Sequence, residues 1–274
     1  MKVLITVKAY PAISTKYGET VCTAGITEDG KWIRIYPIPF RKLDYNKQFK
    51  KYDWVEIDLI RNAKDFRPES YRPKSFNDIK TIGHIESDGN IWYKRRKVVL
   101  KKVYTNLNDL ILEAKDKKIC TSLATFKPAE IINFIWEPVS NEWNPRTLKM
   151  IESKNAQANL FETIDEDDIE NFEVVNKVPY KFSFIFMDMK GKQSKMMIED
   201  WETGMLYWNS LIRQNGDEQK ACEDVKKKYF DDFAKTKDYY FFLGTTKRYH
   251  FEAPNPFVII GDFRPKPIFD EGMF

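Results

Sequence analysis

The sequence predicts an α+β protein in which a small antiparallel β-barrel or curled sheet precedes a C-terminal unit with a hairpin, two helices and buried strands. Three observations support this class. Residues 1–104 hold short stretches rich in β-branched and aromatic residues, residues 203–235 carry two amphipathic helical patterns, and two nearly continuous apolar runs follow. The chain has 274 residues, of which 42% are hydrophobic, so it can bury two modest cores.

The N-terminal strands are predicted from short alternating stretches bounded by turn residues. The Asp29-Gly30 pair is typical of a hairpin turn between two of them. A second Asp-Gly pair, at 88–89, predicts a further hairpin within residues 79–104. The four leading stretches are KVLITVK at 2–8, TVCTAGI at 20–26, KWIRIYPI at 31–38 and DWVEIDLI at 53–60.

Alternation within 31–38 predicts which side chains share a face. Ile33 and Ile35 fall on one face, while Arg34 and Tyr36 fall on the other with an aromatic neighbour. We expect this second face to be exposed to solvent. Arg34 there either contacts a ligand or forms an ordinary cross-strand ion pair with a carboxylate of 53–60.

Helical patterns begin after the β-rich part. NLNDLILEAKDKKI at 106–119 and FKPAEIINFIWEP at 126–138 are predicted as bridging helices, the second with Pro128 near its start. We place a basic β-rich domain at 1–155, an acidic connection at 156–174 and an α+β domain at 175–274.

The C-terminal domain is predicted to open with a hairpin turned at Lys190-Gly191. Two core-facing helices and two buried strands should follow, because the helical stretches have apolar residues at helical spacing and the strands are nearly all apolar. The apolar positions expected to face the core are Met205, Trp208, Leu211 and Ile212 in the first helix and Cys222, Val225, Tyr229 and Phe233 in the second. The expected buried strands are YYFFLGT at 239–245 and PFVIIGDF at 256–263.

Composition excludes several classes of protein. Cys22, Cys120 and Cys222 are widely spaced and odd in number, and with only two histidines they argue against a disulfide framework or a multi-ligand zinc site. The sequence has no apolar run long enough to span a membrane, so we expect a cytoplasmic protein without a membrane partner.

Positive charge is concentrated in the N-terminal part. Residues 1–104 hold 22 Lys and Arg against 12 Asp and Glu, whereas the remainder of the chain is acidic. A basic face indicates an anionic partner, and nucleic acid is the commonest one inside cells. The alternative is a lysine-rich, solvated surface that binds nothing.

The stretch DFRPESYRP, at 65–73, predicts a rigid recognition loop. Its two prolines restrict the backbone, its arginines suit phosphate or guanine, and its tyrosine offers a stacking face. The alternative is a scaffolding loop in which Glu69 pairs with one of the arginines and Tyr71 covers the end of the barrel. The predicted nucleic-acid contacts are Arg34, Tyr36, Arg41, Lys50, Lys51, Arg67, Glu69, Ser70, Tyr71, Arg72, Arg95 and Arg96.

Two further stretches suggest chemistry. Asp200 and Glu202 in IEDWETG could bind Mg²⁺ and serve catalysis in a nuclease. Alternatively, Thr203 or Glu202 could cap the helix that follows. In LGTTKRYH at 243–250, the glycine- and hydroxyl-rich turn before Lys247 could hold an anion. His250 is a candidate general base, although a lone loop histidine is more often simply exposed.

Five blocks in this order resemble a group of uncharacterised bacterial proteins. The blocks are CTAG, RIYPIPFR, RPESYRP, DWETG and FFLGT. The resemblance covers most of the chain and implies no activity. The predicted N-terminal part is also similar in architecture to the small PUA and ASCH barrels that bind RNA or modified bases, although architecture does not decide function.

The sequence therefore predicts a nucleic-acid-binding protein that reads a strand, or a flipped or modified base, through the loop at 65–73. One alternative is a Mg²⁺-dependent nuclease with ligands in the C-terminal half. Another is an interaction subunit of a larger complex, whose basic face meets an acidic protein. In the nucleic-acid-binding case, the C-terminal half could bind a protein partner. We expect no cofactor other than Mg²⁺, and Mg²⁺ only in the nuclease case.

Overall fold

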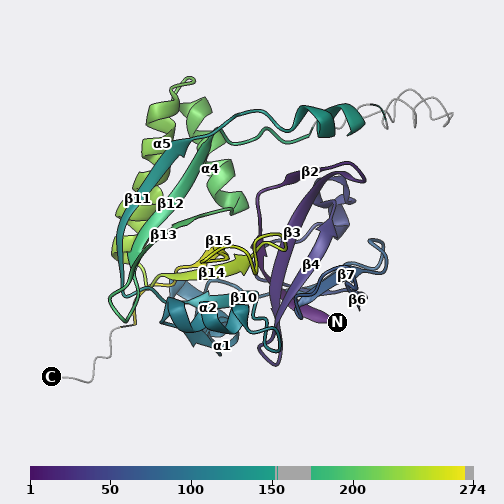
Figure 1. The fold of residues 1–274 in the computed structure, drawn as a ribbon, viewed down its shortest axis with the longest axis horizontal. Coiled ribbons are helices and arrows are strands. Elements are labelled where there is room, and N and C mark those ends of the chain that lie inside the picture. The colour runs from purple at the N-terminus through teal and green to yellow at the C-terminus, as the bar shows by residue number, and fades with distance from the viewer. Residues whose placement is uncertain (152, 154–173, 269–274) are drawn as a thin grey trace.

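The computed structural model describes residues 1–151, 153 and 174–268, and it confirms the α+β class with a curled N-terminal sheet (Figure 1). The predicted acidic connection at 156–174 lies, apart from its last residue, outside the described residues. None of the helices in the described ranges is long and apolar enough to cross a membrane.

The N-terminal sheet has eight strands, in the order β6-β7-β4-β3-β1-β5-β8, with β2 paired to β3. All neighbours are antiparallel except β4 and β7, which run parallel. The predicted turn at Asp29-Gly30 is confirmed, since Gly30 has φ +89 and joins β3 to β4. The strands are β1 (Lys2–Lys8), β2 (Ala12–Ser14), β3 (Gly18–Thr27), β4 (Trp32–Ile38), β5 (Asp53–Glu56), β6 (Leu59–Arg61), β7 (Ser70–Pro73) and β8 (Lys80–His84).

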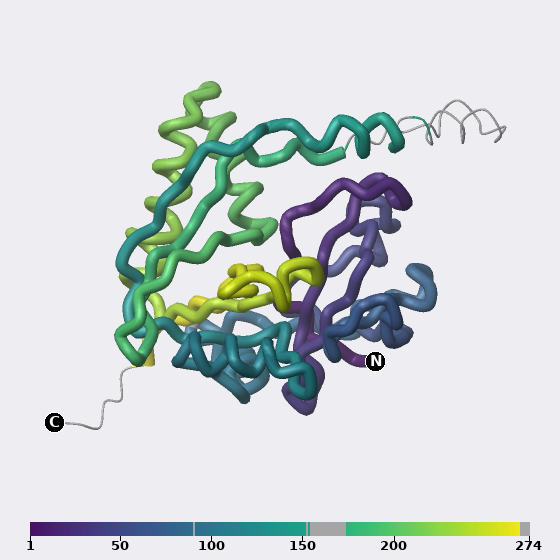
Figure 2. Tube along the Cα trace, viewed as in Figure 1, coloured from purple at the N-terminus to yellow at the C-terminus, as the bar shows by residue number. Residues whose placement is uncertain are grey.

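Both faces of this sheet are covered. Ile33 and Ile35 pack with Val3 and Val55 in a core inside the curl, as predicted. The prediction that the other face is exposed to solvent is wrong around Trp32, because that face packs on Phe242 and other residues of the C-terminal strands. Figure 2 shows these strands, in yellow, meeting the purple N-terminal strands.

The remaining strands form two sheets. A four-stranded sheet has the order β15-β14-β10-β9, and a three-stranded sheet has the order β11-β12-β13. The predicted hairpin around Lys190-Gly191 is confirmed as β12 and β13. The strands are β9 (Val103–Tyr104), β10 (Leu123–Phe126), β11 (Glu130–Pro138), β12 (Tyr180–Met187), β13 (Gln193–Met197), β14 (Tyr240–Thr245) and β15 (Phe257–Phe263).

Two predicted elements are wrong. The expected helix at 126–138 is mainly strand β11, because this apolar run pairs along its whole length with β12, a partner more than forty residues later in the chain. The expected second strand of the hairpin at 79–104 is instead the short helix α1 (Tyr93–Val99), preceded by the 3₁₀ turn η3 (Asp88–Asn90). The predicted helix at 106–119 is confirmed as α2 (Leu107–Lys115).

The C-terminal helices cover one face of β11–β13 (Figure 1). They are α4 (Trp201–Arg213), α5 (Glu218–Lys226) and the π-helical continuation η5 (Lys227–Ala234). The core-facing residues predicted for the second helix are all buried. The face predicted for α4 is partly wrong: Tyr207 and Ser210 are buried, whereas Met205 and Ile212 are exposed.

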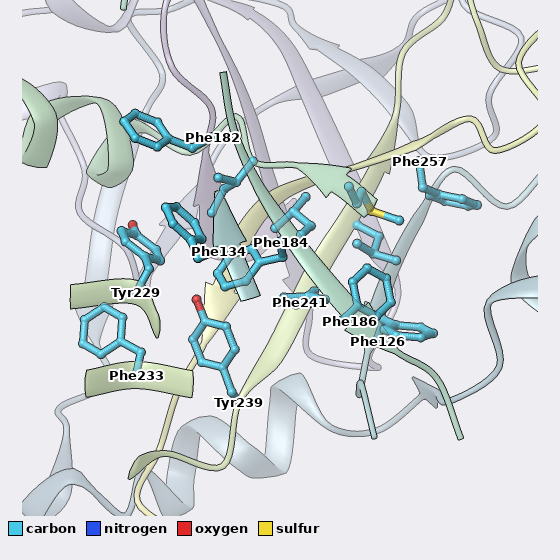
Figure 3. Close-up of a cluster of buried hydrophobic side chains, with 14 of the residues drawn as sticks. Phe126, Phe134, Phe182, Phe184, Phe186, Tyr229, Phe233, Tyr239, Phe241 and Phe257 are labelled. Atoms are coloured by element: carbon cyan, nitrogen blue, oxygen red, sulfur yellow. The ribbon is translucent and has the colours of Figure 1, made fainter. Parts of the chain in front are cut away.

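An aromatic cluster fills the space between these helices and the strands (Figure 3). Phe134 of β11 stacks on Tyr229 of η5 at a centroid distance of 5.5 Å and meets Phe184 of β12 edge-on at 4.8 Å. Phe184 in turn lies 5.0 Å from Phe241 of β14. Strands from residues 123–138 and from residues 180–263 therefore share one core.

Gly25→Ala should destabilise the protein. A Cβ at Gly25 would lie 2.3 Å from the backbone oxygen of Leu4, so β1 and β3 would have to separate. We expect a loss of about 1–3 kcal/mol, the usual range for overpacking, measured from urea unfolding. The matched control is Gly83→Ala in β8, where a Cβ meets nothing within 4 Å. Equal stabilities of the two variants would contradict this packing.

Candidate nucleic-acid interface

The predicted recognition loop connects β6 to β7, and its last residues form β7. Arg34 of β4 and Ser70 of β7 are neighbours in the parallel pair, and the Arg34 N–H donates to the Glu69 carbonyl at 2.8 Å. The loop is thus built into the edge of the N-terminal sheet.

Arg67 is bound inside the fold. Its Nε and Nη2 donate to the two carboxylate oxygens of Asp65 at 2.9 and 2.6 Å, and its Nη1 donates to the carbonyl of Thr245. Only 7% of Arg67 is exposed. Burial alone would raise the pKa of Asp65, but the hydrogen bonds and charge of Arg67 outweigh it and hold this pKa at about 2.

Arg34 and Glu69 meet on Ser122. The guanidinium of Arg34 donates to Ser122 Oγ at 2.8 Å and to its carbonyl at 3.1 Å. Glu69 accepts from the N–H and the hydroxyl of Ser122 at 3.0 and 2.8 Å. We call Arg34, Asp65, Arg67, Glu69, Ser122 and Thr245 the junction cluster, because it joins the loop to the turn before β10 and to the end of β14.

The junction cluster corresponds to the scaffolding alternative, with other partners than expected. Glu69 binds Ser122 instead of an arginine, and Arg67 binds Asp65. Arg34 is only 3% exposed, and Ser70 is buried as well. Arg34, Arg67 and Ser70 were predicted to contact a nucleic acid. These three residues are too buried to offer surface for a direct contact.

A basic cleft of about 700 Å³ lies beside the loop. Six basic residues and one carboxylate line it, and that carboxylate, Asp65, is already paired with Arg67. Among the described residues, the other five basic side chains form no ion pair within 4.0 Å. The lining residues are Lys16, Tyr17, Tyr36, Pro37, Arg61, Asn62, Ala63, Lys64, Asp65, Arg67, Arg72 and Lys247.

Backbone carbonyls orient two cations of the basic cleft. Arg61 Nη1 donates to the carbonyl of Ser70 at 2.6 Å, and Lys247 Nζ donates to the carbonyl of Lys64. Arg72 is exposed on β7. These neutral acceptors fix the side chains without cancelling their charge.

Tyrosines line the same cleft. Tyr36 is 41% exposed, and its hydroxyl accepts from Thr20 Oγ1 at 3.3 Å. Lys16 lies 4.8 Å above the ring of Tyr17. The sequence pointed to Tyr36, Arg72 and the turn at Lys247. It missed Lys16, Tyr17, Arg61 and Lys64, which carry no local motif.

Tyr71 and Glu69 face a different cavity. It measures about 370 Å³ and lies on the other side of the loop, where Pro68, Trp32 and Tyr104 also line it. The predicted contacts at 65–73 are therefore divided between this pocket, the basic cleft and the junction cluster.

The other predicted nucleic-acid contacts are scattered. Arg41 pairs with Glu19 at 2.8 Å, and Arg96 pairs with Asp238 at 2.8 Å. Arg95 is buried against the ring of Tyr52, 3.8 Å from its centroid. Lys50 is exposed but does not line the basic cleft.

Asp200 and Glu202, the predicted metal ligands, are paired with cations. Lys51 Nζ lies 2.9 Å from Asp200 Oδ1 and 3.4 Å from Glu202, and Arg264 donates to Glu202 at 3.1 Å. Burial raises the pKa of Asp200 above its usual range despite Lys51. Burial also opposes ionisation of Glu202, but Lys51 and Arg264 outweigh it and hold that pKa below its usual range. Within the described part of the chain, no group of three or more acidic, histidine or cysteine side chains is placed to hold a metal ion.

Asp200 and Glu202 also mark the start of α4. Asp200 is the N-cap residue, although its side chain makes no cap hydrogen bond, and Glu202 lies in the first turn. Negative charge there is favoured by the helix dipole, as the capping alternative proposed. Lys51 comes from the N-terminal part, so this ionic group also joins the two halves of the chain.

His250 is buried, contrary to the expectation of an exposed loop histidine. Its Nε2 donates to the carbonyl of Ala114 at 2.7 Å, and its Nδ1 accepts from the hydroxyl of Thr245 at 2.7 Å. Burial lowers the pKa of His250, and this favours the neutral ring. Both ring nitrogens are therefore engaged in holding the fold.

Asp65→Asn should cost about 2 kcal/mol of stability at neutral pH, because it removes the partner of a buried guanidinium. The folded pKa of Asp65 is depressed from 3.8 to about 2, so its contribution is present above 3.8 and disappears as pH falls to about 2. Urea unfolding of wild type and variant across this window should show the difference shrinking with acid. The exposed Asp58→Asn, 3.9 Å from Lys74, is the control and should change little. A difference that does not depend on pH would refute the assignment.

Two family models match the chain. The model described as Domain of unknown function (DUF8758) matches residues 1–101, and the one described as Domain of unknown function (DUF8757) matches residues 103–273. The division falls directly before β9, the first strand of the four-stranded sheet. Searches of curated proteins and of solved structures each found no match. Since the second model covers more than half of the residues, the chain belongs to the family described as Domain of unknown function (DUF8757).

Proposed function

We propose that the protein binds nucleic acid and that the basic cleft is the surface that holds the phosphate backbone. The observation that carries this proposal is the set of five basic side chains, without carboxylate partners among the described residues, that line one cleft together with two tyrosines. A concentration of cations on a single concave surface attracts a polyanion and displaces its counterions.

The chemistry of the side chains fits a nucleic-acid backbone. Arg61 and Arg72 offer planar donor groups that suit phosphate oxygens, while Lys64 and Lys247 act as point charges. Tyr36 offers exposed ring surface for a base or sugar. Cations and aromatic rings in one cleft are typical of proteins that hold a strand by charge and stacking together.

The cleft is supported from beneath by the junction cluster. Asp65 and Arg67 belong to both the cluster and the cleft wall, and Arg67 donates to Thr245, two residues before Lys247. Arg61 and Lys247 are therefore positioned before a ligand arrives, which lowers the entropic cost of binding. Base reading through the loop at 65–73, including recognition of a modified base, stays a prediction.

The alternatives stay predictions as well. In the nuclease alternative, Mg²⁺ would have to displace Lys51 and Arg264 from the oxygens of Asp200 and Glu202. A protein partner for the C-terminal half would have exposed apolar side chains of α4 to use, among them Ile212. Among the described residues, the sites of these two alternatives lack a concentration of unpaired charge like that of the basic cleft.

The double variant Lys64→Ala/Arg72→Ala should weaken nucleic-acid binding by about tenfold near 0.1 M salt. Each lost phosphate contact should also reduce the slope of log affinity against log salt concentration by about 0.7–0.9. Fluorescence anisotropy with labelled DNA and RNA at several salt concentrations measures both quantities.

The matched control for this experiment is Lys190→Ala/Lys227→Ala. It removes the same charge from two exposed lysines outside the cleft and should leave affinity and slope nearly unchanged. Equal loss in both double variants would mean that net charge, and not the cleft, determines binding. No binding by the wild type at low salt would refute the proposed function.

A further inference from the structure

Two phenylalanine rings form an exposed stacked pair near the basic cleft. Phe66 is 44% exposed and Phe251 is 41% exposed, and their centroids lie 5.0 Å apart with an interplanar angle of 26°. Tyr249, from the same turn as Phe251, is 47% exposed. We call Phe66, Tyr249 and Phe251 the aromatic platform. Exposed aromatic side chains gathered at one place on a soluble protein commonly mark a binding surface.

The platform rests on a fixed base. The buried ring of His250 meets Phe66 edge-on at 5.3 Å and Phe251 at 4.7 Å. His250 is itself held by Thr245 and Ala114, while Lys115 Nζ donates to the carbonyls of His250 and Ala253 at 2.9 and 2.6 Å. The rings are thus kept at the surface by buried hydrogen bonds beneath them.

The platform adjoins the basic cleft through both segments that build it. Phe66 lies between Asp65 and Arg67, which line the cleft, and the Lys247 side chain joins the two segments by donating to the Lys64 carbonyl. Arg248 lies 5.1 Å from the ring of Tyr249. The rings therefore have cations on the neighbouring surface, and the carboxylate in the cleft lining, Asp65, is paired with Arg67.

We infer that the ligand of the cleft is a single-stranded nucleic acid whose bases stack on the aromatic platform while its phosphates lie along the basic cleft. This inference rests on the proposed function. An unpaired strand exposes base faces that a ring can cover, whereas a duplex stacks those faces on one another. The stacked phenylalanine rings have no polar group to read a base edge, so Phe66 and Phe251 should bind strands with little sequence preference.

The test compares three labelled ligands by fluorescence anisotropy near 0.1 M salt: a single strand, the duplex of the same sequence and a single strand of abasic sugar-phosphate. DNA and RNA single strands are measured in parallel. Phe66→Ala/Phe251→Ala should lose about tenfold or more of its affinity for the single strand, the scale of one to two lost base stacks. Its affinities for the duplex and the abasic strand should stay within about twofold of wild type.

Two controls keep the result interpretable. Phe66→Leu/Phe251→Leu retains apolar bulk over His250 but has no ring, so it should lose single-strand affinity to a similar extent while unfolding at the same urea concentration as wild type. Tyr45→Ala removes a ring that is 90% exposed and outside the cleft, and it should change nothing.

The outcomes separate the two proposals. If the single strand binds the leucine variant as tightly as wild type, or if the duplex binds wild type more tightly than the single strand does, the aromatic platform inference is overturned while nucleic-acid binding stands. If none of the ligands binds wild type, the proposed function fails and the inference fails with it. In that last case, the basic cleft and the aromatic platform would suit an acidic protein as the partner.

Discussion

The burial of two guanidinium groups against the carbonyl of Thr245 is the constraint on which the rest of the structure depends. A buried cation destabilises a fold unless its donors are satisfied, because the charge is then left without a partner away from water. Arg34 and Arg67 both reach Thr245, from 211 and 178 residues away, and the Thr245 hydroxyl donates to His250. One residue at the end of β14 therefore couples the N-terminal sheet, the loop at 65–73 and the base of the aromatic platform.

A second charged group holds the same two parts of the chain together elsewhere. Lys51 comes from the N-terminal part, and it lies between Asp200 and Glu202 at the start of α4. Arg264, which follows β15, bridges Glu202 and Asp262. Because both ionic groups are largely buried, sliding the two parts against each other would leave charges without partners. The cleft and the platform, each built from both parts, therefore have a rigid support.

The sequence predicted elements whose signals are local and missed those decided by distant partners. The turn at Asp29-Gly30 needs positive φ at a glycine, and the second C-terminal helix carries its own apolar face, so both were found. The run at 126–138 is apolar in a pattern that suits a buried helix or a strand, and only pairing with β12 decides between them. Arg34 looked like a surface residue because two of the residues that bind its side chain, Ser122 and Thr245, lie 88 and 211 residues further along the chain.

The candidate site was only partly predicted because many partners of the predicted cations are also distant in the sequence. The excess of positive charge in residues 1–104 is real, but many of those cations serve internal contacts: Lys51 binds Asp200, Arg67 binds Asp65 and Arg96 binds Asp238. What matters for an anionic ligand is the charge left unpaired after folding, and, among the described residues, five such cations line one cleft where residues 16–17, 36–37, 61–67, 72 and 247 converge. Net charge indicates the class of partner, whereas the fold decides which cations can meet it.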